Sequence, residues 1–314
     1  MARLGMWLAA AVAVSCVAAR AEEIKHRFLM MDESRHAVHC VDESNPDGNW
    51  DLPVGGGIHD FQLIGRGQLL VSQGSGYAVY DMATRKTVKE LKRGDLNGTM
   101  SVRARADGTK VVGANQKGIV VFELDAADKV VRKMAFPELK ALRMMRLTAE
   151  GNVVLAEEAG VTEAAFDASS PAGGRIVRRV KLPRSRNAFM ALKAASGNYL
   201  VGAGFAQAFL ELTPEGKIVR DLTAAAMPAP LVNKFYAGFQ VLKNGHVVVC
   251  NWTGHAAPDS KLGWQLVQFD KEGKVVWKWH DPQRAGTAIG VIVLDDLDAG
   301  AFNHDIDGVL GPAK

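Results

Sequence analysis

Three stretches of the chain place histidine beside groups that could direct its chemistry. They are His59-Asp60, His280-Asp281 and Asn251-Trp252-Thr-Gly-His255. A histidine beside a carboxylate can be held in one tautomer, as a general base or a metal ligand requires. The plainer interpretation of each histidine is a hydrogen-bonded cap where a loop begins. No His-x-x-x-His spacing is present, so any divalent metal would need ligands far apart in the chain, and the sequence leaves metal binding open.

A second set of polar residues recurs at a fixed distance before a glycine. The fifth residue before each of four such glycines is Gln62, Arg103, Arg146 or Gln240. In a fifth copy this count selects Leu192, and a shift of one residue brings Lys193 into the set. Arginine suits bidentate contact with a carboxylate, sulfate or phosphate, so the set predicts a funnel that binds anions. The alternative is a hydrated channel in which these side chains satisfy backbone groups.

The elements that position these residues form a repeat. An apolar stretch, a glycine turn and a second apolar stretch recur five times, with turn glycines at Gly67, Gly108, Gly151, Gly197 and Gly245. Each copy of this pattern is followed by two further strand-like runs. Units of four short strands with a period in the forties predict the blades of a β-propeller.

The two ends of the chain supply one further blade. Residues 286–294 read as an innermost strand, and 27–31, 36–41 and 49–52 read as three strands without a leader. Together they predict a six-bladed β-propeller over 22–297, closed by one C-terminal and three N-terminal strands. The rival architectures are a β-sandwich and a two-domain protein, and the regular spacing disfavours both. Residues 298–314 are expected to be a plug or a disordered tail.

Propeller topology predicts which loops meet. The loops that lead into innermost strands and those between the second and third strands emerge at one mouth of the channel. This expected mouth holds His59, Asp60, Asn251, Trp252, His255, His280 and Asp281.

The turn between the third and fourth strands carries a family resemblance. Phe269-Asp-Lys-Glu-Gly-Lys-Val-Val-Trp277 and Leu212-Thr-Pro-Glu-Gly-Lys-Ile-Val219 resemble repeats of bacterial PQQ-like propellers, in which such a unit docks one blade on the next. The Val-Trp-Lys-Trp ending before His280-Asp281 also resembles arylsulfotransferase-like propellers. The resemblance implies fold far more than activity. The vicinal cysteine pair of quinoproteins is absent, so PQQ is not expected as a cofactor.

Composition and the first residues indicate the compartment. The chain has 314 residues, 48% of them hydrophobic, and a net charge of +4. Residues 1–21 have a cationic start, an apolar run and Ala19-Arg20-Ala21, the pattern of a secretory signal peptide. A retained membrane anchor and lipidation at Cys16 are the alternatives. Export would place Cys40 and Cys250 in an oxidising compartment, where two buried free thiols are favoured over a disulfide.

The remaining charge and the motifs limit the function. Arg3 and Arg20 account for two of the four net charges, which leaves +2 after residue 21 and gives no reason to expect nucleic-acid binding. After residue 21 no run approaches the roughly 20 apolar residues of a membrane span. We expect an exported protein, periplasmic or extracellular, that binds an anionic small molecule, a glycan or a protein at the mouth. The alternative is a carbohydrate- or ester-active enzyme of lyase, lactonase or sulfotransferase type. In such an enzyme His59, Asp60 or His280 would act as acid–base catalysts and Arg103 and Arg146 would stabilise negative charge.

Overall fold

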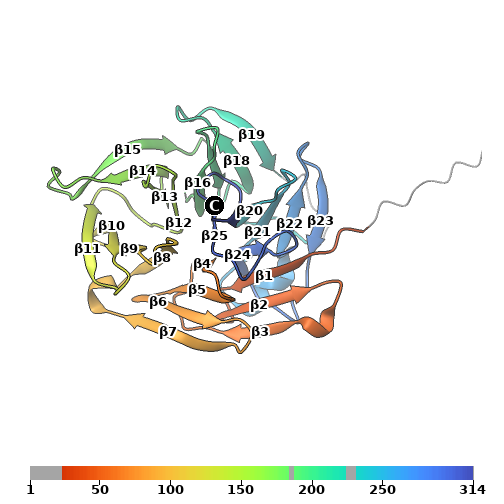
Figure 1. The fold of residues 1–314 in the computed structure, drawn as a ribbon. Helices are drawn as coiled ribbons and strands as arrows, with labels where there is room; N and C mark the ends of the chain where they lie inside the picture. The colour runs from red at the N-terminus through yellow and green to blue at the C-terminus, as the bar shows by residue number, and fades with distance from the viewer. Residues whose placement is uncertain (1–22, 184–186, 224–230, 314) are drawn as a thin grey trace, which may run out of the picture.

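The described chain is a ring of six β-sheets. The structure, a computed structural model, describes residues 23–183, 187–223 and 231–313. The expectations for residues 1–21, Cys16 included, fall outside this part of the chain. Within it, six four-stranded antiparallel sheets surround a central channel as blades (Figure 1). The predicted six-bladed β-propeller is confirmed.

The blades follow the repeat. From innermost to outermost strand, blade 1 is β4 (Phe61–Leu63), β5 (Gln68–Gln73), β6 (Gly76–Asp81) and β7 (Lys86–Lys92); blade 2 is β8 (Thr99–Ala104), β9 (Lys110–Gln116), β10 (Gly118–Leu124) and β11 (Val130–Phe136); blade 3 is β12 (Met145–Leu147), β13 (Val153–Glu157), β14 (Gly160–Phe166) and β15 (Gly174–Lys181). Blade 4 is β16 (Met190–Lys193), β17 (Tyr199–Gly202), β18 (Ala208–Leu212) and β19 (Ile218–Thr223); blade 5 is β20 (Tyr236–Val241), β21 (Val247–Asn251), β22 (Leu266–Phe269) and β23 (Val275–Trp279). The closing blade is β24 (Ala288–Val293), β1 (Arg27–Asp32), β2 (Ala37–Asp42) and β3 (Trp50–Pro53).

Short connections complete the described chain. Three 3-10 segments, η1 (Pro46–Gly48), η2 (Gly94–Leu96) and η3 (Ala257–Leu262), lie in loops. After β24, the chain forms the two-stranded ribbon of β25 (Asn303–His304) and β26 (Gly311–Pro312). In the described ranges no helix has the length and apolar character that crossing a membrane requires.

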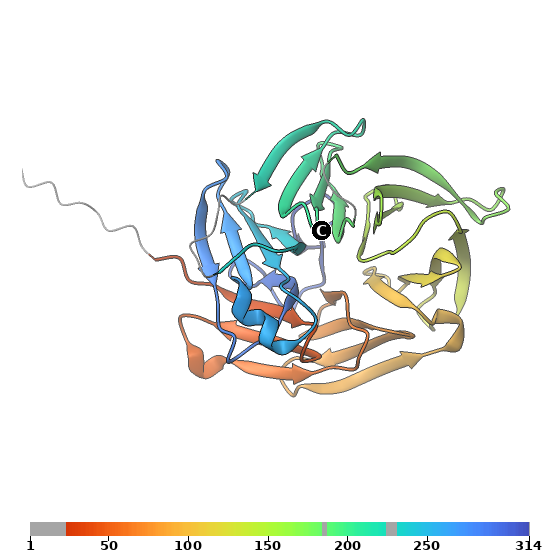
Figure 2. The ribbon, with the colours of Figure 1, turned by 180° about the vertical axis from the view of Figure 1, so that it is seen from behind.

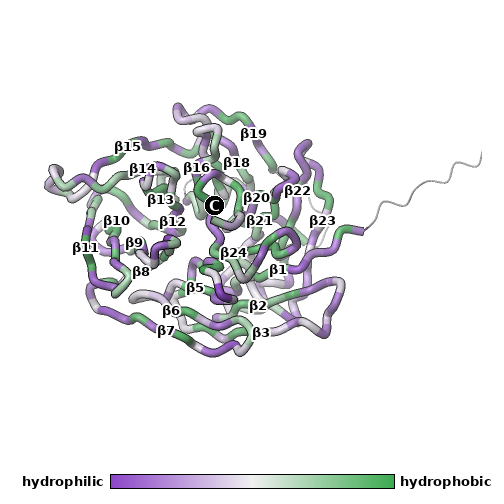
Figure 3. Tube along the Cα trace, in the orientation of Figure 1, coloured by the Kyte–Doolittle hydropathy of each residue, from purple (hydrophilic) through white to green (hydrophobic). Residues whose placement is uncertain are grey.

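The turn glycines explain where each innermost strand ends. Gly108 and Gly151 have φ values of +85° and +81°, a backbone region in which a side chain is unfavourable. Each therefore reverses the chain between the first and second strands of its blade. The inner strands are buried on both faces, whereas the outermost strands are largely exposed and mix polar with apolar residues (Figure 3).

Adjacent blades dock through the end of the outermost strand. Trp277 in β23 is buried, packs edge-on against Phe28 of β1 and donates its indole N–H to Glu43 of the closing blade at 3.0 Å. Arg220 stands at the matching place in β19, and its Nη2 donates to the Asp270 carbonyl of blade 5 at 3.0 Å. Both contacts reach the turn between the third and fourth strands of the following blade.

Candidate functional site

The channel has two different ends. The loops into the innermost strands and those between second and third strands form one end, which we call the first mouth (Figure 2). The opposite end, which we call the far face, is covered by residues 294–313 after β24. Asn303 and Asp305 of that segment are buried, and Phe302 bridges to Ile64 at the end of β4. Residues 298–313 therefore cover this end of the channel.

His59 lies half-buried at the first mouth. Its Nδ1 is 3.4 Å from the Gly57 carbonyl oxygen. Burial holds the pKa of His59 below its ordinary value of 6.5, and the positive charge of Arg143 acts in the same direction. The Gly57 carbonyl and the carboxylates of Glu33 and Asp60 oppose this effect. His59 is thus a neutral imidazole at pH 7, within electrostatic range of one arginine and two acids.

Arg143 contributes a guanidinium to this mouth that has no carboxylate partner among the residues that the structure describes. It precedes β12 in the loop that leads into blade 3, and its buried Nε has no hydrogen-bond partner. Across the residues that the structure describes, no carboxylate lies within ion-pair distance of its guanidinium. A partly buried guanidinium with unused donors favours binding of an anion from solution.

Aromatic rings line the blade 4 and blade 5 side of the first mouth. Phe205, which is 58% exposed, packs edge-on against Phe235 at 4.7 Å between ring centroids. Phe235 contacts Trp252 at 5.4 Å, and Trp252 contacts His255 at 4.7 Å, again edge-on. The four rings come from three loops and contact one another in series, with Phe235 buried between Phe205 and Trp252; we call this series the aromatic row.

Glu33 fixes one end of the aromatic row. Trp252 donates its indole N–H to Glu33 at 2.6 Å, and His255 Nδ1 lies 3.3 Å from the other oxygen of the same carboxylate. Glu33 belongs to the loop between β1 and β2, and its backbone N–H bonds the Thr287 carbonyl. The contact therefore ties blade 5 to the closing blade at the mouth.

Asn251 positions this row and is itself inaccessible. It is fully buried, and its Oδ1 accepts from the backbone of Lys234 while its Nδ2 donates to Val232 and Trp264 carbonyls. The expectation that its side chain contacts a ligand is wrong, because every polar atom is used by the backbone.

The side chains of His280 and Asp281 bond backbone groups of the loops around them. His280 Nδ1 is 3.0 Å from the Gly263 carbonyl, and its ring packs edge-on against Trp264. Asp281 accepts the backbone N–H groups of Gln283 and Arg284, as a turn residue does. In the described ranges no hydrogen bond or ion pair joins either residue to His59 or Arg143. Of the two histidines that the sequence offers as acid–base catalysts, His59 is the one within electrostatic range of Arg143.

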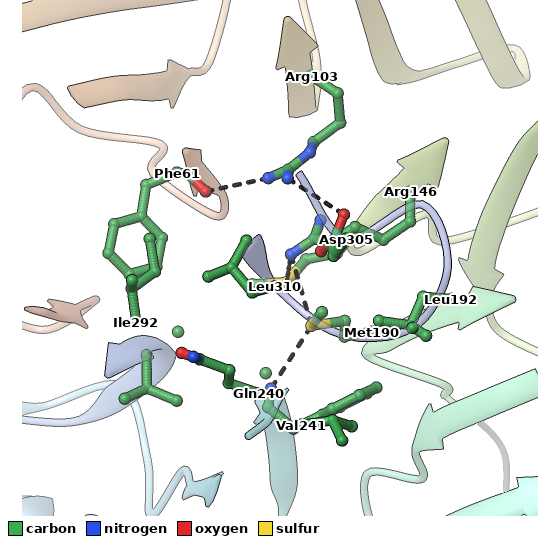
Figure 4. Close-up of a pocket in the computed structure, with 16 residues that line it drawn as sticks. Phe61, Arg103, Arg146, Met190, Leu192, Gln240, Val241, Ile292, Asp305 and Leu310 are labelled. Atoms are coloured by element: carbon green, nitrogen blue, oxygen red, sulfur yellow. Dashed lines mark hydrogen bonds and ion pairs between the residues drawn. The ribbon is translucent and has the colours of Figure 1, made fainter. Parts of the chain in front are cut away.

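The arginines of the predicted funnel are neutralised within the protein. Arg146 Nη1 is 2.9 Å from Asp60 Oδ2, and Arg146 Nε is 2.7 Å from Asp305 Oδ2. Arg103 lies 3.4 Å from Asp305 (Figure 4) and 3.6 Å from Asp60. Asp60 is fully buried and also binds Ser101, so its carboxylate faces the channel and not His59.

The glutamines of the funnel join neighbouring innermost strands. Gln62 accepts the N–H of Ala104 at 2.9 Å and donates to the carbonyls of Ala104 and Asn303. Gln240 accepts the N–H of Val293 at 2.6 Å and donates to its carbonyl at 3.3 Å. These two residues follow the alternative expectation, in which channel side chains satisfy backbone groups.

Lys193 does not belong to the channel, and the expectation that it does is wrong. Its Nζ lies 3.3 Å from the buried Glu163 and 3.5 Å from Glu150, both in blade 3. Leu192, the residue that the unshifted count selects, lines the channel in its place. The alternation of side chains along β16 needs no one-residue shift in this blade. An apolar side chain can form the channel wall at this position as well as a polar one.

The channel interior leaves little free space. A cavity of about 30 Å³ is bounded by Phe61, Met190, Leu310 and other side chains around the arginines (Figure 4). This volume is enough for about two water molecules and too small for an organic ligand. An organic ligand would therefore have to bind outside the channel interior.

No metal centre or disulfide is formed by the residues described. In the described ranges, no three His, Cys, Asp or Glu side chains are grouped so that they could hold a metal ion. Cys40 and Cys250 are both buried free thiols.

Comparison with known proteins supports the fold and no more. No family model and no curated protein matches the chain. A protein of unknown function from Bacteroides caccae is similar in structure, with a TM-score of 0.69, 22% identity and coverage of 87% of this chain and 100% of that one. A streptogramin B lyase is similar with a TM-score of 0.54 and 10% identity, over 82% of this chain and 83% of that one. The calcium-binding protein regucalcin from Agrobacterium tumefaciens is similar with a TM-score of 0.53 and 11% identity, over 71% of this chain and 76% of that one. The fold is a β-propeller. The PQQ-like and arylsulfotransferase-like resemblance stays a prediction.

Sequence reasoning missed several residues of the first mouth. Glu33, Arg143, Phe205 and Phe235 all stand in loops of the two types that were expected to form it. The topology argument that predicted which loops meet could have selected these residues. Only side-chain geometry, however, shows whether an arginine in such a loop has a carboxylate partner.

Proposed function

We propose that the protein binds an anionic sugar, carboxylated or sulfated, at the first mouth. The observation that carries the proposal is Arg143, whose guanidinium lacks a carboxylate partner in the described ranges while its Nε is buried. Arginine binds carboxylate and sulfate with paired hydrogen bonds.

The aromatic row supplies the second half of the site. The exposed ring of Phe205 offers an apolar surface against which the C–H face of a sugar ring can pack, and the buried ring of Phe235 supports it from below and connects it to Trp252. Glu33 and His59 add polar groups for hydroxyls. A few polar groups around an apolar surface is the usual composition of a small-molecule site.

Replacement of Arg143 tests the proposal. We expect Arg143→Met to weaken binding of glucuronate or a sulfated glucose by about tenfold to a hundredfold, the value of a hydrogen bond to a charged group. Isothermal titration calorimetry measures it. Arg178→Met, on the exposed face of β15, is the matched control and should bind as the wild type does. Unchanged affinity in Arg143→Met, or equal binding of uncharged glucose, would contradict the proposal.

His59 supports a second candidate function at the same place. A neutral imidazole in range of Arg143 has the protonation state of a general base, and the guanidinium could stabilise negative charge that develops on a bound anion. Among the enzyme types expected from sequence, this arrangement favours a lyase that removes a proton next to a carboxylate.

We also propose that the protein is exported. Support comes from the signal-like pattern of residues 1–21. N-terminal sequencing of the protein isolated from its own cell should begin at Glu22, and a chain that keeps Met1 would contradict export by cleavage.

A further inference from the structure

Two carboxylates from opposite ends of the molecule meet at the centre of the channel. Asp60 comes from the loop before β4 at the first mouth, and Asp305 comes from the segment that covers the far face. Arg103 and Arg146, on the innermost strands β8 and β12, contact both carboxylates. Figure 4 shows them beside Asp305. All four side chains are at most 10% exposed, so water screens their charges poorly.

The blades alone would leave this group with excess positive charge. Arg103, Arg146 and Asp60 belong to the blades and their loops, and they sum to one positive charge. Asp305 belongs to the segment after the last strand and supplies the balancing negative charge. A buried guanidinium without a counter-charge is strongly unfavourable, so this part of the channel requires an anion.

The segment that carries Asp305 is held mainly through its backbone. Arg66 donates its backbone N–H to the Gly300 carbonyl at 2.7 Å, and Ala195 donates to the Asp307 carbonyl at 2.8 Å. Gln62 donates to the Asn303 carbonyl at 3.0 Å. These contacts hold the backbone of the segment in place, so that the Asp305 carboxylate reaches the arginines. A peptide bound in a groove would present a side chain to a pocket in the same way.

We infer that Arg103 and Arg146 form a carboxylate-binding site of the propeller, and that Asp305 of the C-terminal segment is its tethered occupant. Removal of the Asp305 carboxylate opens space beside the existing cavity of about 30 Å³. The site then accepts a small free carboxylate such as formate. It is distinct from the first mouth, because Arg143 takes no part in it.

Chemical rescue tests the inference. We expect Asp305→Ala to lower the midpoint of thermal unfolding by roughly 5–10 °C, as for a buried ion pair that loses one partner. Sodium formate, at constant ionic strength held with sodium chloride, should restore at least half of that loss with a saturable dose dependence. Asp307→Ala, an exposed aspartate in the same segment, is the matched control and should not respond to formate.

Each other outcome has a defined meaning. A midpoint unchanged by Asp305→Ala, or an equal formate effect on the variant and the wild type, overturns the inference. If Asp305→Ala does not accumulate, Asp305→Ser is refolded from urea with and without formate. A yield that depends on formate supports the site, and equal yields overturn it. Formate rescue does not depend on sugar binding at the first mouth. Either proposal can therefore be contradicted while the other stands.

Discussion

His59 is the residue at which the two candidate functions make opposite predictions. Its pKa lies below 6.5, so it is neutral at pH 7 and gains a positive charge as the pH falls through that lowered value. A second cation near Arg143 strengthens anion binding. We expect a sulfated sugar, whose charge is constant in this range, to bind about threefold to tenfold more tightly below the lowered pKa of His59 than at pH 7. Calorimetry at a series of pH values from 7 downward measures the difference.

His59→Gln separates this effect from other titrations. The variant should lose the pH dependence and keep the affinity of pH 7; the same dependence in the variant would show that another group causes it. If the protein is a lyase, turnover instead falls as the pH falls, because the base becomes protonated. His59→Gln would then abolish turnover and retain binding.

Single residues also show where sequence reasoning stops. The count that selected Gln62, Arg103, Arg146 and Gln240 follows the alternation of side chains along a strand, and Arg103, Arg146 and Gln240 line the channel cavity. It could not show that Arg146 meets Asp305, since the two are brought together only by the path of the C-terminal segment. The shift to Lys193 failed because it assumed that every position of the wall is polar.

The elements were more predictable than the site. A turn glycine after five of the six innermost strands is visible in the sequence, and so is the alternation that follows it; the structure gives each of these glycines a positive φ. The predicted strand at 286–294 corresponds to β24, Ala288–Val293, and the predicted 49–52 to β3, Trp50–Pro53. These are local patterns. The position of β25 and β26 depends on the shape of the completed ring and has no local signal.

Two blades contact the following blade through the same position of their outermost strand, but with different types of side chain. Trp277 and Arg220 each stand four residues after the turn glycine of their blade, Gly273 and Gly216, and each reaches the following blade. An indole contributes buried apolar area, whereas a guanidinium contributes hydrogen bonds. The position is therefore recognisable by spacing, while a search for tryptophan alone would find it in only one of the two blades.

At the scale of the whole molecule, closure of the ring depends on Asp32. This carboxylate is fully buried and accepts the Gly286 N–H at 2.6 Å and His39 Nε2 at 3.0 Å. Ser34 donates to its other oxygen at 2.8 Å. Because Gly286 precedes β24 and Asp32 ends β1, one side chain joins the C-terminal strand of the closing blade to its N-terminal strands.

Replacement of Asp32 should weaken the entire ring, with a defined pH dependence. Burial alone would raise the pKa of Asp32, but its bonds to His39, Gly286 and Ser34 hold it below 3.8. A carboxyl whose pKa is lowered by folding stabilises the protein above 3.8, and this contribution disappears as the pH falls through the lower, folded value. We therefore expect Asp32→Asn to cost about 3–5 kcal/mol of unfolding free energy at pH 6, with less difference from the wild type below pH 3.8. Urea unfolding at each pH measures it.

The form of the unfolding transition completes this test. Since the closing blade contacts both blade 1 and blade 5, we expect a single transition that moves to lower urea, with no separate early phase. Asp47→Asn, an exposed acid of η1 in the same N-terminal region, should leave stability within about 0.5 kcal/mol of the wild type. A loss in Asp32→Asn that is equally large at pH 3 and pH 6 would show that the carboxylate charge is not what closes the ring.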